Sequence, residues 1–172
     1  ATIEFLNGKM KVHKGGDLPF PVLTNTAYAE AIVQTKQVVK SASSGFSFTD
    51  NSMERFAKAC SMVKQFQQAS TNVSPVDYSF SLLDKVAQGS HTKWSIVYDI
   101  TNKKIHFKSL GYPAVRSVAF AAFDFACTAI PMAWDINQDR SGDVAGLFHP
   151  FTLAFNSRIF TRSFEESRPQ LN

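Results

Sequence analysis

The chain offers few side chains whose type and spacing could carry out chemistry, and a polar run near its end is the first candidate. Residues 135–143 place oxygen-bearing side chains at alternate positions, as calcium-binding loops do. An EF-hand loop that begins at Asp135, however, needs a glycine where Arg140 stands and a bidentate glutamate where Gly146 stands. The run therefore predicts a plain polar turn, and we expect neither a metal nor a cofactor.

The histidines and cysteines form no recognisable catalytic or metal-binding pattern. The four histidines lack the short spacing of a metal site. They are His13, His91, His106 and His149. Cys60 and Cys127 belong to no CxxC pair and lie in apolar sequence, so we expect both to be buried, inert thiols. A Ser–His–Asp assignment is possible on residue types alone, but no serine stands in a GxSxG elbow, and these residues by themselves indicate no particular reaction.

The composition predicts one folded domain, residues 1–172. Hydrophobic residues make up 44% of the chain and charged residues 19%, below the roughly 25% typical of soluble domains. A single core in a chain of this length buries roughly 70% of the surface that the unfolded chain exposes. The sixteen phenylalanines are therefore expected in a well-filled core or at an interface.

The charge pattern argues against nucleic acid as a partner. The net charge is +4, but the basic residues are spread over an expected hairpin, a turn and a late helix instead of forming a patch. No apolar run approaches the roughly 20 residues of a membrane span, and the first residues lack a signal-peptide pattern. We expect a chain that binds neither nucleic acid nor a membrane, in a compartment that these residues leave undetermined.

Two hairpins frame the secondary structure that the sequence predicts. Residues 2–6 and 9–13 alternate in polarity around Asn7-Gly8, the dipeptide typical of a type I′ turn. Residues 94–100 and 105–110 alternate in the same way around a polar turn. Together these segments indicate an antiparallel sheet.

Between the hairpins the apolar period changes from two to about 3.6, which indicates helices packed on that sheet. We expect helices at 26–39, from a cap at Asp50 or Asn51 to Gln67, from Pro75 to about Gln88, and from Pro150 to about Phe164, and a strand at 117–126. The fold class is therefore α+β. Because the chain opens directly into a strand, we also expect it to be cut from something larger.

Three motifs in a fixed order resemble the choloylglycine hydrolase and penicillin V acylase family of linear amide C–N hydrolases. Residues 22–25, VLTN, match one motif, and residues 52–56, SMERF, match the family's S-x-x-R-F element after a loop with Gly45 and Phe46. Residues 92–99, TKWSIVYD, resemble the family's TxWxxVYD strand. The tail that follows also looks like the longer, acylase-type members.

The resemblance implies an N-terminal-nucleophile hydrolase, whose αββα core stacks two antiparallel sheets between helices in four layers. Such enzymes use an N-terminal cysteine, its amino group as base and its thiol as nucleophile, to attack an amide and form a thioester. Asn25 matches the family asparagine that binds the tetrahedral oxyanion, and Arg55 matches the arginine near the nucleophile. Each residue also has an alternative structural role. Asn25 could cap the helix that follows it, and the side chain of Arg55 could cover apolar surface.

The family's cysteine nucleophile and the arginine and aspartate that follow it precede the position of Ala1. We therefore expect this chain, the C-terminal part of such an enzyme, to be inactive alone and to need that missing N-terminal segment. It could be a fragment of the hydrolase, a non-catalytic binding module, or a chain that complements a second polypeptide. The resemblance implies a small-molecule acyl amide substrate, a homo-oligomer, and relatives that are often exported to the periplasm.

Overall fold

The computed structural model describes residues 1–41, 51–68 and 73–167. It divides into two compact units, Ala1–Gln88 and Gly89–Asn172, and each is described by itself. The prediction of a single domain over residues 1–172 stays a prediction. Gly45, Phe46 and a helix cap at Asp50 lie outside the described residues.

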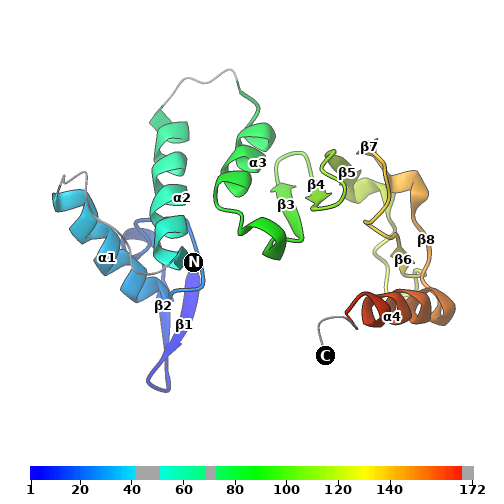
Figure 1. The fold of residues 1–172 in the computed structure, drawn as a ribbon, viewed down its shortest axis with the longest axis horizontal. Coiled ribbons are helices and arrows are strands. Elements are labelled where there is room, and N and C mark those ends of the chain that lie inside the picture. Colours follow the sequence, from blue (N-terminus) through cyan, green and yellow to red (C-terminus); the bar gives the residue numbers. More distant parts are fainter. Residues whose placement is uncertain (42–50, 69–72, 168–172) are drawn as a thin grey trace. The chain divides into compact units, whose positions relative to one another are not determined.

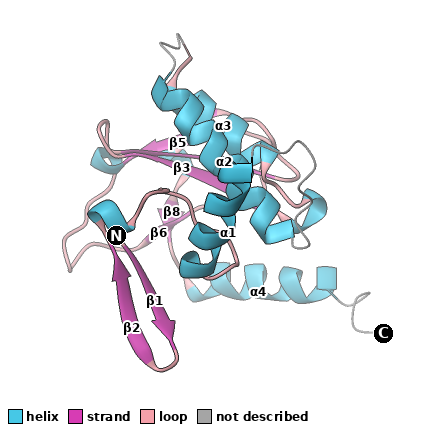
Figure 2. Cartoon of the chain, turned by 90° about the vertical axis from the view of Figure 1, so that its left-hand side faces the viewer, coloured by secondary structure: helices cyan, strands magenta, loops and turns pink. Residues whose placement is uncertain are grey.

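The first unit opens with the predicted hairpin. Strands β1 (Thr2–Leu6) and β2 (Lys9–His13) pair antiparallel, with Thr2 opposite His13 and Leu6 opposite Lys9. Asn7 and Gly8 have φ values of 51° and 75°, the left-handed conformation that both central residues of a type I′ turn require. The hairpin and its turn are confirmed, and Figure 2 shows the two strands side by side, joined by the turn.

Three helices follow in the first unit, all at predicted places (Figure 1). The helices are α1 (Tyr28–Ser41), α2 (Asn51–Gln68) and α3 (Pro75–Lys85). A short 3₁₀ turn at Gly15–Asp17 precedes them. Helix α3 has Pro75 in its first turn, where the missing amide hydrogen costs nothing. It ends three residues before the predicted Gln88 because Val86, with φ −108° and ψ 5°, has already left helical geometry.

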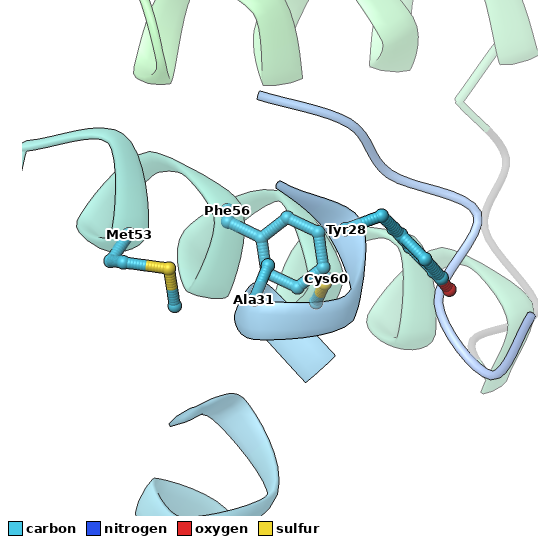
Figure 3. Packing of buried hydrophobic residues seen from close by; sticks show 5 residues of the cluster. All are labelled: Tyr28, Ala31, Met53, Phe56 and Cys60. Carbon is cyan, nitrogen blue, oxygen red and sulfur yellow. The ribbon is translucent and has the colours of Figure 1, made fainter. Parts of the chain in front are cut away.

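The core of the first unit lies between α1 and α2. Figure 3 shows five buried side chains gathered there, which are Tyr28, Ala31, Met53, Phe56 and Cys60. Leu18, Phe20 and Val22, from the segment between β2 and α1, pack against them. Burying each large apolar side chain contributes roughly 1.5–3 kcal/mol, so this cluster fixes that segment against both helices.

The second unit is built on a four-stranded sheet. Its strands are β3 (Trp94–Asp99), β4 (Lys104–Ser109), β5 (Arg116–Ala119) and β7 (Gly142–Asp143), in that order. The first three pair antiparallel, which confirms the second hairpin to within one residue at its ends. The pair β5–β7 is parallel, so the chain crosses from the end of β5 back to the start of β7 through residues 120–141.

Two further elements complete the second unit. Strands β6 (Met132–Ala133) and β8 (His149–Pro150) form a short antiparallel pair. Helix α4 (Leu153–Ser167) follows and begins three residues after the predicted Pro150. Thr152 caps it, since its hydroxyl accepts the Phe155 amide at 3.1 Å.

The predicted strand over 117–126 is confirmed only as far as Ala119 and is wrong beyond that residue. Strand β5 ends at Ala119, and a 3₁₀ turn, η3 (Phe120–Ala122), and then irregular chain at 123–126 follow it. The Phe123 amide donates to the Phe120 carbonyl at 3.1 Å, and the Phe123 ring packs on Phe148 with ring centres 4.9 Å apart. The apolar residues of this stretch therefore fill space beside the sheet instead of extending it.

Arg116 lies at the centre of the second unit and is 0% exposed. Its guanidinium donates to the carbonyls of Ile136 at 2.6 Å and Tyr112 at 3.0 Å, and it lies over the rings of Phe107 and Trp134. Desolvation lowers the pKa of Arg116 from its ordinary value. These contacts fasten the polar loop after Trp134 to strands β4 and β5.

The loop at 135–143 forms local turns. The Asp135 carboxylate accepts the Asn137 amide, and the Asp143 carboxylate accepts the Ala145 amide, each at 2.9 Å. In the described ranges, no group of three or more acidic, histidine or cysteine side chains could hold a metal ion. None of the helices in this part of the chain combines the length and apolarity that a membrane crossing needs.

Candidate functional site

Asn25 and Arg55 come together although thirty residues separate them in sequence. The Nη2 atom of Arg55, in the second turn of α2, donates a hydrogen bond of 2.8 Å to Oδ1 of Asn25. Asn25 is exposed and lies just before α1, and Arg55 is half-buried. The VLTN and S-x-x-R-F segments thus meet at one surface position of the first unit.

The direction of this hydrogen bond decides what Asn25 can do. A guanidinium only donates, so the oxygen of the Asn25 amide is the atom that faces Arg55. The Nδ2 amide group then lies on the other side of the side chain with two N–H donors. The pair therefore presents donors and a permanent positive charge, the chemistry that stabilises an anionic oxygen.

The backbone on either side of Asn25 is fastened to the start of α2. The hydroxyl of Ser52 accepts the Thr26 amide at 3.0 Å and donates to the Thr24 hydroxyl at 3.0 Å. Ser52 is buried, with 5% of its surface exposed. Two hydrogen bonds from one side chain thus hold both neighbours of Asn25.

Glu4 fixes the start of α1 from the hairpin. Its carboxylate accepts the amides of Tyr28 and Ala29, the latter at 3.0 Å, and meets the His13 ring at 2.8 Å. Burial acts to raise the pKa of the Glu4 carboxyl, but the hydrogen bonds from the two amides and the His13 ring outweigh it. The pKa of Glu4 therefore lies below its ordinary value. A carboxylate at this helix end also complements the helix dipole.

Tyr28 anchors the other end of the same segment. Its hydroxyl donates to the Phe20 carbonyl at 2.8 Å and accepts the Phe20 amide at 3.2 Å, and its ring lies edge-on to His13. Desolvation raises the pKa of Tyr28. The segment that ends in Asn25 is thus fixed at Phe20, at Thr24 and at the first residues of α1.

Sequence reasoning did not identify Glu4, His13, Ser52 or Tyr28 as support for this site. Each acts through partners in another element, so no local spacing predicts the contact. The available signal was weak: Glu4 and His13 fall on the same face of the predicted hairpin, at diagonal positions of its register. A charged side chain that is buried on a two-stranded ribbon needs a partner of opposite charge or a hydrogen-bond partner.

The two cysteines differ in their surroundings. Cys60 is buried in the core of the first unit, and this burial raises its pKa to about 12. It is therefore a protonated thiol at neutral pH and a poor nucleophile. Cys127 is exposed, so the prediction that both thiols are buried is wrong for this residue. It lies in a turn between η3 and β6.

The second unit holds a cavity of about 620 Å³. Residues from the sheet and from the crossover line it, including Trp94, Ile105, Phe123, Phe125, Trp134 and Phe148. Its size is within the range of small-molecule pockets. The lining is almost entirely apolar, with Asp124 and Lys108 as its charged members.

Comparison with known proteins bears on the fold. No family model matches the chain, and no curated protein sequence matches it. Among solved structures, penicillin V acylase from Agrobacterium tumefaciens is similar, with a TM-score of 0.68 and 18% sequence identity. The match covers 87% of this chain and 52% of that one, so this chain spans about half the length of the acylase. The helices and sheets described above thus share the α+β fold of that acylase over that half.

Proposed function

We propose that this chain carries the oxyanion-binding part of a site that hydrolyses linear amide C–N bonds. The observation that supports it is the 2.8 Å hydrogen bond from Arg55 to Asn25, which joins the two residues that the family resemblance singles out. The likeness to a penicillin V acylase agrees with this chemistry. An amide with an aromatic acyl group, as in penicillin V, is the substrate class that we favour over bile salts.

In the proposed reaction, a cysteine thiolate attacks the amide carbonyl and the carbonyl oxygen becomes an oxyanion. Nδ2 of Asn25 donates a hydrogen bond to that oxygen, and the charge of Arg55 stabilises the negative charge nearby. The C–N bond then breaks, the amine leaves with a proton, and water hydrolyses the remaining thioester. Loss of one such donor typically lowers turnover by about 10²–10³.

The nucleophile in this proposal is an N-terminal cysteine supplied by a segment that precedes Ala1. Cys60 does not serve, because its pKa of about 12 leaves almost no thiolate at neutral pH. Cys127 matches no catalytic position of the family. We therefore propose that the chain alone does not turn over amides, and that it acts together with the segment that carries the cysteine.

Binding of a product carboxylate tests the oxyanion site directly. Phenoxyacetate, the acid released from penicillin V, carries an anionic oxygen in the place of the oxyanion. We expect its titration to shift the NMR signals of the Asn25 side-chain amide, and Asn25→Ala or Arg55→Ala to weaken binding. Arg158→Ala, in the second unit, is the matched control for loss of one positive charge. Phenoxyacetate that leaves the Asn25 signals unchanged at millimolar concentration would refute the site.

Turnover assays distinguish an amidase from the alternative, a non-catalytic binding module. The chain is assayed with penicillin V, glycine-conjugated bile acids and acyl-homoserine lactones, alone and with the cysteine-bearing segment. Hydrolysis only in the combined sample, and its loss after a thiol reagent, is the expected result. Phenoxyacetate binding without hydrolysis in either sample favours the binding module. The expected homo-oligomer stays a prediction, which light scattering tests.

A further inference from the structure

Ser52 supports the candidate site through the two neighbours of Asn25. It stands in the first turn of α2, and its hydroxyl bonds to the residues immediately before and after Asn25. A hydroxyl oxygen can accept from the Thr26 amide and donate to the Thr24 oxygen through one and the same atom. With 5% exposure, Ser52 is nearly closed to solvent, so water cannot easily replace either bond.

The helix geometry explains why this matters for Asn25. Ser52 and Arg55 are three residues apart on α2, so they lie on the same side of the helix, one turn apart. Ser52 holds the backbone that carries Asn25, and Arg55 then meets the Asn25 side chain at 2.8 Å. Helix α2 thus contacts the segment around Asn25 twice, through Ser52 to its backbone and, one turn later, through Arg55 to the Asn25 side chain.

We propose that Ser52 is a positioning residue. Its hydroxyl binds Thr24 and Thr26 to the first turn of α2, and this places the side-chain oxygen of Asn25 within hydrogen-bond distance of Arg55. The proposal rests on the proposed function only for its catalytic consequence. The positioning itself concerns the order of the Asn25 side chain, which can be measured whether or not the site cleaves amides.

The order of the Asn25 side-chain amide in NMR relaxation, together with hydrogen exchange of the Thr26 amide, tests the positioning. In Ser52→Ala we expect the Asn25 amide to become mobile and the Thr26 amide to exchange about fivefold faster, since one ordinary hydrogen bond is lost. Ser52→Thr keeps the hydroxyl and should retain most of the order. Thr24→Val removes only the acceptor of Ser52 and should loosen Asn25 less, which provides a measurement should Ser52→Ala fail to fold.

A matched control separates positioning from general loss of stability. Ala59→Gly weakens the same helix at a buried residue whose side chain has no hydrogen-bonding group. It should lower stability and leave the Asn25 amide ordered. An Asn25 amide that is equally ordered in Ser52→Ala and in the unaltered chain would overturn the proposal, as would equal loosening in Ala59→Gly.

The catalytic arm uses the chain together with the cysteine-bearing segment. We expect Ser52→Ala to lower kcat about tenfold with little change in KM, and to add almost nothing in the Asn25→Ala background, because it acts through Asn25. Unchanged kcat in Ser52→Ala counts against the positioning role. If no variant and no control hydrolyses amides, the proposed function fails, while the NMR result still decides on Ser52.

Discussion

The Glu4 carboxylate lies 2.8 Å from the Nε2 atom of His13, across the hairpin and on the face turned towards α1. The same carboxylate accepts the first amides of α1. One side chain therefore joins both hairpin strands to the helix that follows the VLTN segment. The position of Asn25 depends on this junction as well as on Ser52.

The lowered pKa of Glu4 predicts how stability changes with pH. Its folded pKa lies below the ordinary value of 4.5, so its contribution to stability is complete above that value and is lost as the pH falls through the folded pKa. Glu4→Gln should flatten the fall in the free energy of unfolding between about pH 5 and pH 2. Urea unfolding at several pH values measures this change.

Glu30→Gln is the control for the Glu4 experiment, because Glu30 is exposed on α1 and contacts Gln34 of its own helix. It removes a carboxylate of the same type without opening the junction. The interpretation fails if Glu4→Gln and Glu30→Gln give the same pH dependence as each other.

The two thiols should react at very different rates. The pKa of Cys60 is raised from 9.0 to about 12, a difference of three units, so its thiolate fraction is about 10³ lower at neutral pH. Cys127 is exposed and should react at once with a coloured disulfide reagent. In Cys127→Ser the remaining thiol should react only after denaturant is added. Rapid labelling of native Cys127→Ser would show that Cys60 is accessible.

Arg116→Met should destabilise the second unit by about 3 kcal/mol, because the carbonyls of Ile136 and Tyr112 lose their donor inside the core. Both tryptophans of the chain, Trp94 and Trp134, belong to this unit, so tryptophan fluorescence during urea unfolding reports on it. Arg140→Met, at an exposed position of the neighbouring loop, should change stability by less than about 0.5 kcal/mol. Equal effects of the two substitutions would mean that the carbonyl contacts of Arg116 contribute little.

Replacing the site residues should separate their roles in a preparation that hydrolyses amides. Asn25→Ala should lower kcat by about 10²–10³, and Arg55→Lys should lower it less, because it keeps the charge but loses the planar fork of donors. Steady-state kinetics measure both effects. Gln34→Ala, on the exposed surface of α1, is the control. A kcat in Asn25→Ala within threefold of the unaltered value would exclude an oxyanion role for this side chain.

Local signals predicted most of the elements, and long-range contacts account for what they missed. The Asn7-Gly8 dipeptide and Pro75 act on their own backbone, so the hairpin and the start of α3 could be predicted from sequence. The end of β5 at Ala119 depends instead on where Phe123 packs, which alternation alone does not reveal. Apolar neighbours likewise misled the prediction for Cys127.

The candidate site was reached through family resemblance and not through spacing. Asn25 and Arg55 lie on different elements, and no period of a helix or strand relates them. Their hydrogen bond is known only from the folded chain, and so are the hydrogen bonds of Ser52. The sequence was enough to predict that Asn25 and Arg55 belong to the site. That Arg55 donates to the oxygen of Asn25 follows only from three-dimensional packing.

Because β5 pairs with β7 in parallel, a long connection joins the two strands, and its middle portion can tolerate changes in sequence. Antiparallel neighbours can be joined by a tight turn, whereas this pair needs a long return path, which here is irregular and carries no α-helix. Phe123, which packs on Phe148, secures the first portion of that path, and Arg116 and Trp134 secure the last portion. Residues 126–130 can therefore change in length or composition while the sheet keeps its order, and a protein engineer could graft new loops there first.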